Sequence, residues 1–584
     1  MRKHKKNPSL NVKRKNANKT IKVIVQIVLL TAVLFVLVGK IFVVRHYAEP
    51  VRAEWNQQRG FTAVSYFGVA RKADAKSVSR QQLEAQLKAL HDDGYVTISQ
   101  QDIIDYYFKG KALPDKALFL SFEDGRNDSA LFAQPILEKY NYKATFLTYA
   151  DKMGDSQGKF VQPKQMQKML KSGFWEMGSN GYRLSYINVF DNQGISLGVK
   201  DEKTLPDKTK IGYYNHYLMD FIRDENMIPI ENRADMQKRI AEDYTRMQNV
   251  YTDTLGYVPG VYMIMHANSL GSNMNKLVSE ANSTNIEQLF SMHFNREGSS
   301  YNTRRSGIYN LTRVQPGASW STNHLLMKLR EDSKQDTTFV VGDVSQAGNW
   351  TVSQGAAEFN EDRIVLTSRP GKTGRMHLNT NVEASNLSFS AKLLGSVVGS
   401  QSVSLGSTDQ LKISLADNQL LVEQKTDGKP FEQLFAAVLP PVEWHDRDIQ
   451  LNKASVYTQS EVMQAKALDE TDYPSNLPGN RNLTFTIQGD KLQLSIDGNV
   501  QINDLRISPK ISDGTLALES VYSSKNKKDN IYDAVFQDVN IRSAANDGAE
   551  EQVWFTNKAS GLQSVGRTLS RSIDHSINWA IDTF

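Results

Sequence analysis

The longest apolar run of the chain lies near its beginning. Residues 23–44 are 22 mostly apolar residues, interrupted by the strongly polar Gln26 and Lys40. At about 1.5 Å per residue, a helix of this length matches a hydrocarbon core of about 30 Å, so the run predicts a membrane-spanning helix. A cleaved signal peptide is the alternative, but the run exceeds the usual length of about 7–15 apolar residues and no small-x-small site follows closely.

Charge predicts how this helix is oriented. Residues 1–22 carry nine Lys or Arg and no acidic residue, which is typical of a cytoplasmic tail. We expect a single-pass protein of a bacterial plasma membrane, with a linker at 45–61 and the bulk of the chain outside the cell. The chain contains no cysteine, so an exported protein of this sequence folds without disulfide bonds.

The remaining charge argues against a nucleic-acid partner. Residues 1–22, Lys40 and Arg45 hold eleven of the 69 basic residues, which leaves 58 basic residues against 64 acidic ones in the rest. This excess of acid would repel a phosphate backbone.

From residue 62 to 333, short apolar strands alternate with amphipathic helices. Residues 62–70 predict a strand, and Ser79 is expected to cap a helix whose Leu83, Leu87 and Leu90 share one face. The repeated alternation predicts an α/β domain with a parallel sheet over 62–333.

Residues 338–545 instead carry short alternating segments separated by Gly, Asn and Asp. In residues 482–500 the apolar positions of two segments face one side and are separated by Gly489 and Asp490, which predicts a β-hairpin. The whole region predicts an all-β sandwich. Its pattern resembles the concanavalin-like jelly-roll modules of carbohydrate-active proteins, and that resemblance implies a carbohydrate-binding module.

Residues 546–584 end in a predicted amphipathic helix from about residue 561. Its apolar positions recur at helical spacing, with polar residues opposite. Two interpretations stay open: the helix docks on the core of its own chain, or it binds a membrane surface or a partner in a synthase complex.

Adjacent carboxylates end one of the predicted strands of the α/β region. The strand 117–122 is followed by Glu123, Asp124 and Gly125, then by a helix and the strand segment KATFL at 143–147. Ligands bind at strand ends in α/β folds, although such acids can also simply cap a turn.

This arrangement resembles the polysaccharide deacetylase family, the NodB-homology carbohydrate esterases. YFGV at 66–69 and QLKALHDDGYVTIS at 86–99 add to the likeness, which covers about residues 62–333. It implies a distorted (β/α) barrel that removes acetyl groups from a polysaccharide, with Glu123 and Asp124 as catalytic residues. Glu123 would be the base, one methylene longer than the family's Asp, and Asp124 a metal ligand.

The resemblance also implies a divalent metal held by one Asp and two His. The two histidine positions fall on Asn180 and Leu184, and no histidine occurs between Asp124 and His216. Leucine cannot bind a metal, and an amide oxygen is a poor substitute for imidazole with zinc-like ions. We therefore expect a degenerate metal site.

Polar and aromatic residues around these positions suit a sugar surface. We predict substrate-binding roles for Arg126, Asn180, Tyr182, Arg183 and His266. For the segment 178–191, the alternative interpretation is a polar surface loop. For His266, which lies in an apolar segment, the alternative is a histidine that simply packs in the core.

Three functions compete at this point. A membrane-anchored protein could bind a cell-envelope polysaccharide or exopolysaccharide with a degenerate site and organise its synthase, or it could deacetylate an amino-sugar polymer with unusual ligands. A glycosidase on the same scaffold is a minor alternative. It needs a third acid, because adjacent strand residues such as Glu123 and Asp124 point to opposite faces.

Overall fold

The computed structural model describes residues 23–24, 26–27, 45–73, 77–154, 158–205, 210–264, 270, 274–440, 458–461, 478–511, 514–526, 529–544 and 551–558. The predicted membrane helix lies almost wholly outside these residues, and the predicted terminal helix from about residue 561 lies wholly outside them. Within the described part of the chain, none of the helices has the length and apolar character needed to cross a membrane.

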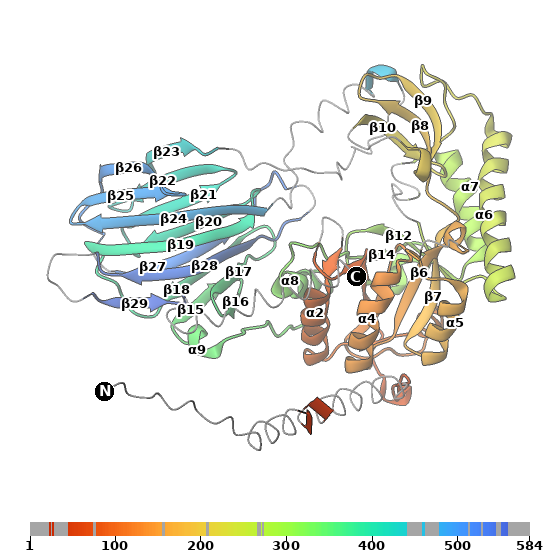
Figure 1. The fold of residues 1–584 in the computed structure, drawn as a ribbon, viewed down its shortest axis with the longest axis horizontal. Coiled ribbons are helices and arrows are strands. Elements are labelled where there is room, and N and C mark those ends of the chain that lie inside the picture. The colour runs from red at the N-terminus through yellow and green to blue at the C-terminus, as the bar shows by residue number, and fades with distance from the viewer. Residues whose placement is uncertain are drawn as a thin grey trace, which may run out of the picture.

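Two regions of regular structure follow one another (Figure 1). The first is a parallel sheet in the order β1-β5-β6-β7-β11-β12-β14, with β13 antiparallel to β1 and β4 beside β5. Backbone bonds from Ser65 N to Val314 O (2.9 Å) and from Val314 N to Ala63 O (3.1 Å) join the last strand to the first. The sheet therefore closes into the predicted barrel-like form.

The strands of this barrel are short and buried. Their bounds are β1 Phe61–Tyr66, β4 Val96–Thr97, β5 Ala117–Phe122, β6 Ala144–Tyr149, β7 Trp175–Gly181, β11 Val261–Met263, β12 Met292–Glu297, β13 Tyr301–Asn302 and β14 Leu311–Arg313. The parallel pair β2 Val69–Ala70 and β3 Val78–Ser79 follows β1.

The helices begin where the sequence offers caps. Ser79 Oγ accepts from Gln82 N at 3.0 Å and starts α2, and Ser99 forms a capping box with Asp102 at the start of α3. The predicted cap at Ser79 is thus confirmed. The helices are α2 Arg80–Asp92, α3 Gln100–Lys109, α4 Asn127–Tyr140, α5 Pro163–Ser172, α6 Arg233–Leu255, α7 Lys276–Leu289, α8 Thr322–Ser333 and the short α9 Val344–Ala347.

A small antiparallel sheet stands above the barrel as an arm (Figure 1). Its order is β10-β8-β9, with bounds Ile211–His216, Ser185–Asp191 and Ser196–Asp201. The strand β8 occupies part of the segment for which a polar loop was the alternative. Asn188, for example, is buried, and its side chain hydrogen-bonds the backbone of Phe221 and Arg223.

The second region is an antiparallel β-sandwich, as predicted. One sheet runs β15-β18-β27-β20-β21-β22-β23 and the other β16-β17-β28-β19-β24-β25-β26, with β29 beside β28. The predicted hairpin is β24–β25, which turns at Gly489 and Asp490. The bounds are β15 Trp350–Gln354, β16 Ala356–Asn360, β17 Arg363–Thr367, β18 Thr373–Leu378, β19 Asn386–Ser396, β20 Ser400–Leu405, β21 Gln410–Ala416, β22 Gln419–Lys425, β23 Glu432–Val438, β24 Pro478–Gln488, β25 Lys491–Ile496, β26 Asn499–Arg506, β27 Leu516–Val521, β28 Asp533–Arg542 and β29 Val553–Thr556.

A buried histidine joins the two regions. His324 on α8 lies 2.7 Å by Nε2 from Asp529 Oδ2 and 3.0 Å by Nδ1 from Asp533 Oδ2, both at the sandwich edge. Its ring stacks on Trp320 at 4.3 Å. Burial alone would lower the pKa of His324, but the carboxylates of Asp533 and Asp529 outweigh it and raise the pKa to about 9.

The contact of His324 with the two aspartates predicts that the stability of the protein depends on pH. A histidine pKa raised above its unfolded value stabilises the fold fully below about 6.5, and the stabilisation, roughly 3 kcal/mol, is lost as pH rises through about 9. The melting temperature of the full chain should therefore exceed that of His324→Gln at pH 6.5, and the gap should narrow above pH 9. His91→Gln, at an exposed site, is the control. A difference in melting temperature that does not change with pH would contradict the raised pKa of His324.

Candidate functional site

The acidic strand end lies at the carboxyl edge of the barrel. Glu123 N donates to Tyr66 O at 2.8 Å and still follows the sheet, whereas Asp124 and Gly125 turn sharply, with φ of 67° and 64°. Aspartate tolerates this left-handed conformation better than most residues. A Cβ at position 125 would lie 3.2 Å from the backbone of Thr148 on β6, so glycine allows the turn to pass close to its neighbour.

Glu123 is completely buried and both of its carboxylate oxygens are engaged. Oε1 accepts from Ser65 Oγ at 2.7 Å and from Arg313 Nε at 2.9 Å, and Oε2 accepts from Arg313 Nη2 at 3.3 Å. The three residues come from β5, β1 and β14, the strands that meet where the barrel closes. Arg313, 4% exposed, is equally enclosed. The carboxylate predicted to be a base therefore sits in an internal ion pair.

Asp124 lies nearer the surface, with its side chain 11% exposed. Its Oδ2 accepts from Arg126 Nε at 2.8 Å. Burial raises the pKa of Asp124, and the guanidinium of Arg126 opposes that rise. The predicted metal ligand and the predicted substrate-binding arginine are thus brought together as a second ion pair.

Asn180 ties the neighbouring strand ends together. Its Oδ1 accepts from Asp124 N at 3.2 Å, and its Nδ2 donates to Met263 O at 3.0 Å. Both ends of the amide are therefore used for backbone contacts from β5 and β11. Leu184, the second expected histidine position, offers no donor atom.

These side chains do not fit the metal that the resemblance implies. Asp124 faces Arg126, Asn180 is committed to backbone groups, and the described residues contain no group of three His, Cys, Asp or Glu side chains able to hold a metal ion. A divalent ion needs several such donors together. His266, predicted to bind substrate, lies outside the described residues.

Tyr182 and Arg183 follow β7 at the same rim. The Arg183 guanidinium carbon lies 5.5 Å from the Tyr182 ring centre and 5.0 Å from that of Tyr217. Asp243 on α6 and Asp201 at the end of β9 each approach the guanidinium at 3.5 Å. Asp243 and Tyr217 are absent from the sequence-based set, because only the fold brings them beside the GYR segment.

The arm adds aromatic rings, one from the polar and aromatic segment 178–191 and two from β10. Tyr186 on β8 lies 5.0 Å by ring centres from both Tyr214 and His216 of β10. Burial raises the pKa of Tyr186, and Tyr214, Glu202 and Asp124 add smaller contributions in the same direction. In the sequence, these rings are indicated by the density of Tyr in the segment 178–191 and in β10.

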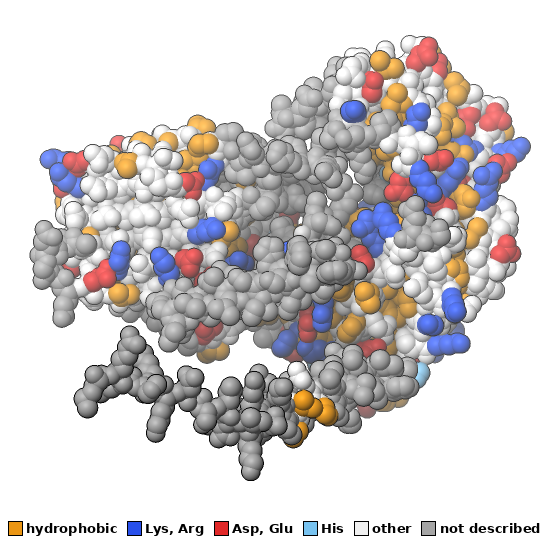
Figure 2. Space-filling model, in the orientation of Figure 1, with side chains coloured by type: hydrophobic (Ala, Val, Ile, Leu, Met, Phe, Trp, Pro, Cys, Tyr) orange, Lys and Arg blue, Asp and Glu red, His pale blue; other side chains and the backbone are white. Residues whose placement is uncertain are grey.

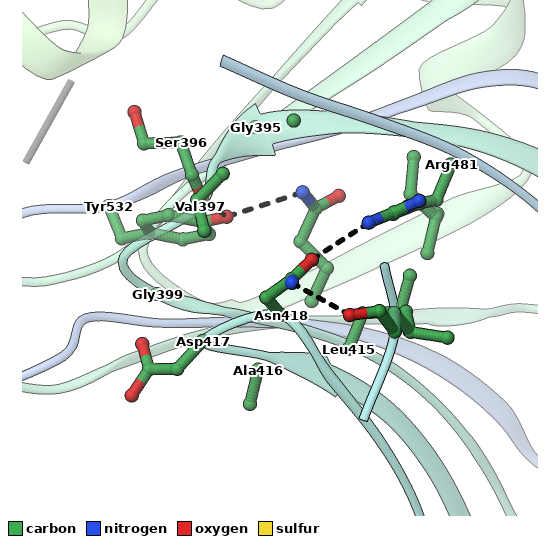
Figure 3. Close-up of a pocket in the computed structure, with 14 residues that line it drawn as sticks. Gly395, Ser396, Val397, Gly399, Leu415, Ala416, Asp417, Asn418, Arg481 and Tyr532 are labelled. Atoms are coloured by element: carbon green, nitrogen blue, oxygen red, sulfur yellow. Dashed lines mark hydrogen bonds between the residues drawn. The ribbon is translucent and has the colours of Figure 1, made fainter. Parts of the chain in front are cut away.

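A separate small hollow lies in the sandwich (Figure 3). Gly395, Gly399 and Tyr532 line one side. On the other, Arg481 Nη2 donates to Asn418 Oδ1 at 2.8 Å, and Asn418 Nδ2 donates to Leu439 O at 3.0 Å. The polar groups joined by dashed lines hydrogen-bond within the protein, so this hollow offers weaker binding chemistry than the barrel rim.

Known proteins resemble the barrel region. Residues 110–285 match the family model described as polysaccharide deacetylase. The chain is 30% identical over 96 residues to a putative polysaccharide deacetylase, YxkH, of Bacillus subtilis (strain 168), covering 16% of this chain and 34% of that protein. It is 27% identical over 147 residues to the poly-β-1,6-N-acetyl-D-glucosamine N-deacetylase of Staphylococcus aureus (strain MSSA476), covering 24% and 49%. The chain thus spans half or less of these relatives' lengths.

Solved structures of similar description also align with this chain. The Streptococcus pyogenes deacetylase PplD in complex with acetate aligns with a TM-score of 0.33 and 16% identity, covering 47% of this chain and 99% of that one. IcaB from Ammonifex degensii aligns with a TM-score of 0.32 and 20% identity, covering 44% and 93%. On the family match, residues 110–285 belong to a polysaccharide deacetylase domain.

The ion pair inside the barrel generates a stability prediction. Arg313→Met leaves Glu123 as an unpaired buried charge, which costs about 3–5 kcal/mol of unfolding free energy. Glu123→Gln added to Arg313→Met removes that charge and should recover most of the loss. Urea denaturation of the full chain measures both variants. Lys88→Ala, which breaks an exposed ion pair with Asp92, should change stability by less than about 1 kcal/mol. An Arg313→Met variant as stable as this control would refute the role of the pair.

Proposed function

We propose that the barrel binds an N-acetylated amino-sugar polysaccharide at its strand ends, with a degenerate metal site that does not support metal-dependent deacetylation. The observation that carries this proposal is the state of Glu123. Its two oxygens are held by Arg313 and Ser65 in a fully buried position, so they are not exposed at the rim. A general base must lie within hydrogen-bond reach of the proton that it removes.

The chemistry of the rim suits a neutral sugar. Each acidic residue of the strand end is matched by an arginine, Glu123 by Arg313 and Asp124 by Arg126. The paired charges leave no excess of either sign to select a charged polymer. Half-buried Tyr182, Tyr214 and Tyr217 add ring surface of the kind that packs on the apolar face of a pyranose. The names of the curated relatives support an N-acetylglucosamine polymer as the class to test.

Deacetylation with non-standard donors is the second candidate. The position of Asp124 favours it, because this carboxylate keeps a strand-end place with partial exposure. The reaction would need a base other than Glu123 and metal donors other than Asn180 and Leu184. The activity names of the relatives also favour this candidate.

The cellular setting is part of the proposal. We infer a single-pass protein of a bacterial plasma membrane, with a cytoplasmic amino terminus, that holds a cell-envelope or exopolysaccharide beside its synthase. The sandwich would serve as a carbohydrate-binding module. On the face shown in Figure 2, basic and acidic side chains are interspersed, which agrees with a neutral ligand better than with a polyanion.

Calorimetry with the full chain tests the proposal. β-1,6-linked N-acetylglucosamine oligomers should bind saturably, and Asp124→Asn should weaken binding about tenfold, because it removes a charged acceptor while keeping the shape. Asp115→Asn is the matched control, since its side chain is 77% exposed and lies before the other end of β5. It should bind like the wild type.

The same samples are assayed for acetate, with and without added zinc, cobalt or manganese. The proposal expects none above the background of buffer. Metal-dependent acetate release that disappears in Asp124→Asn would overturn it and establish the deacetylase candidate.

A further inference from the structure

Arg183 occupies an unusual place beside the strand-end site. Its guanidinium carbon lies 5.5 Å from the ring centre of Tyr182 and 5.0 Å from that of Tyr217, and its side chain is 25% exposed. An arginine beside aromatic rings keeps its N–H donors directed outward in the plane of the guanidinium.

The acidic partners of Arg183 are close but loosely held. Asp243 Oδ1 lies 3.5 Å from Arg183 Nε, and Asp201 Oδ1 lies 3.5 Å from Nη1, beyond the usual range of about 2.7–3.2 Å for a good hydrogen bond. Arg183 Nε and Asp243 Oδ1 are both buried, and beyond this ion pair neither makes a hydrogen bond of good geometry among the described residues. The Asp243 side chain is only 6% exposed. Buried polar atoms of this kind normally have a hydrogen-bond partner, so a hydroxyl group that bonded both residues would satisfy them better than their 3.5 Å contact does.

We propose that Arg183, Asp243, Tyr182 and Tyr217 form a subsite for a neutral pyranose, next to the strand-end site. The inference rests on the proposed function and extends it to a second sugar unit of the same polymer. Neighbouring ring hydroxyls both accept and donate hydrogen bonds, so one can accept from Arg183 while the next donates to Asp243. The tyrosine rings then cover the apolar face of the sugar.

Charge selects this ligand class over the alternatives. Two carboxylates flank the guanidinium, which disfavours a phosphate or sulfate group, and the guanidinium between them disfavours a metal cation. A neutral, hydroxyl-rich group satisfies both kinds of partner without adding charge. Asn180, which touches Asp124, lies at the end of β7 three positions before Arg183, so the strand-end site and the subsite are neighbours along the chain.

The subsite is expected to depend on pH through Asp243. Burial raises the pKa of Asp243 to about 6, and Arg183 opposes the rise. The other charged groups that face it are Arg239 and Arg246 of its own helix. Tyr244 and Tyr262 also surround it, and burial raises both phenol pKa values, so they stay protonated. Between pH 7 and pH 5 the carboxylate becomes protonated and loses part of its strength as an acceptor.

Calorimetry with the β-1,6-linked N-acetylglucosamine hexasaccharide and the full chain tests the subsite. Asp243→Asn should weaken binding about tenfold at pH 7, and its affinity should fall less steeply toward pH 5 than that of the wild type. Glu242→Gln, an exposed neighbour on the same helix, should bind like the wild type. Melting temperatures verify that each variant is folded.

A second pair of variants keeps the test decisive if Asp243→Asn does not fold. Tyr217→Ala should weaken binding about tenfold, while Tyr217→Phe keeps the ring and should bind nearly normally. Unchanged affinity in both Asp243→Asn and Tyr217→Ala would overturn the subsite and leave the strand-end proposal standing. Absence of hexasaccharide binding by the wild type would overturn both.

Discussion

The ion pair between Glu123 and Arg313 is the constraint on which the barrel rim depends. It joins the end of β5 to the end of β14, and Ser65 of β1 hydrogen-bonds the same carboxylate. These strands meet where the sheet closes, at the bonds between Ser65 and Val314. An uncompensated charge here would have no access to water, so each partner requires the other.

The two adjacent acids therefore have different roles. The first acid, Glu123, turns inward and stabilises the closed sheet. The second, Asp124, turns outward at a left-handed residue and meets Arg126 and the backbone-bound amide of Asn180. The proposed binding of a neutral sugar rests on this rim of charge-balanced pairs, an amide and several tyrosines.

The fold was largely predictable from sequence because its signals are local. The leucine stripe after Ser79, the hairpin around Gly489 and the apolar strand before Glu123 each extend over fewer than about 20 residues, within reach of periodicity and capping rules. The closed barrel followed from the family likeness. The arm was less clear, because the burial of Asn188 on β8 depends on a loop that returns more than 30 residues later.

The site could be predicted only in part, for the opposite reason. Glu123, Asp124, Arg126, Asn180, Tyr182 and Arg183 do gather at one rim, but their partners are remote in sequence. Arg313 is 190 positions from Glu123, and no local pattern marks Asp243 as the neighbour of Arg183. The residue types indicated the candidate residues, but only the ion pairs between residues remote in sequence show which carboxylate oxygens are already engaged within the protein.

The most direct test of the central claim is NMR on an oligomer of N-acetylglucosamine labelled with ¹³C in its acetyl groups, mixed with the full chain and zinc. The account predicts that the acetamide methyl signals shift or broaden on binding while no free acetate signal grows. Growth of an acetate signal with time, in proportion to the protein added, would contradict it.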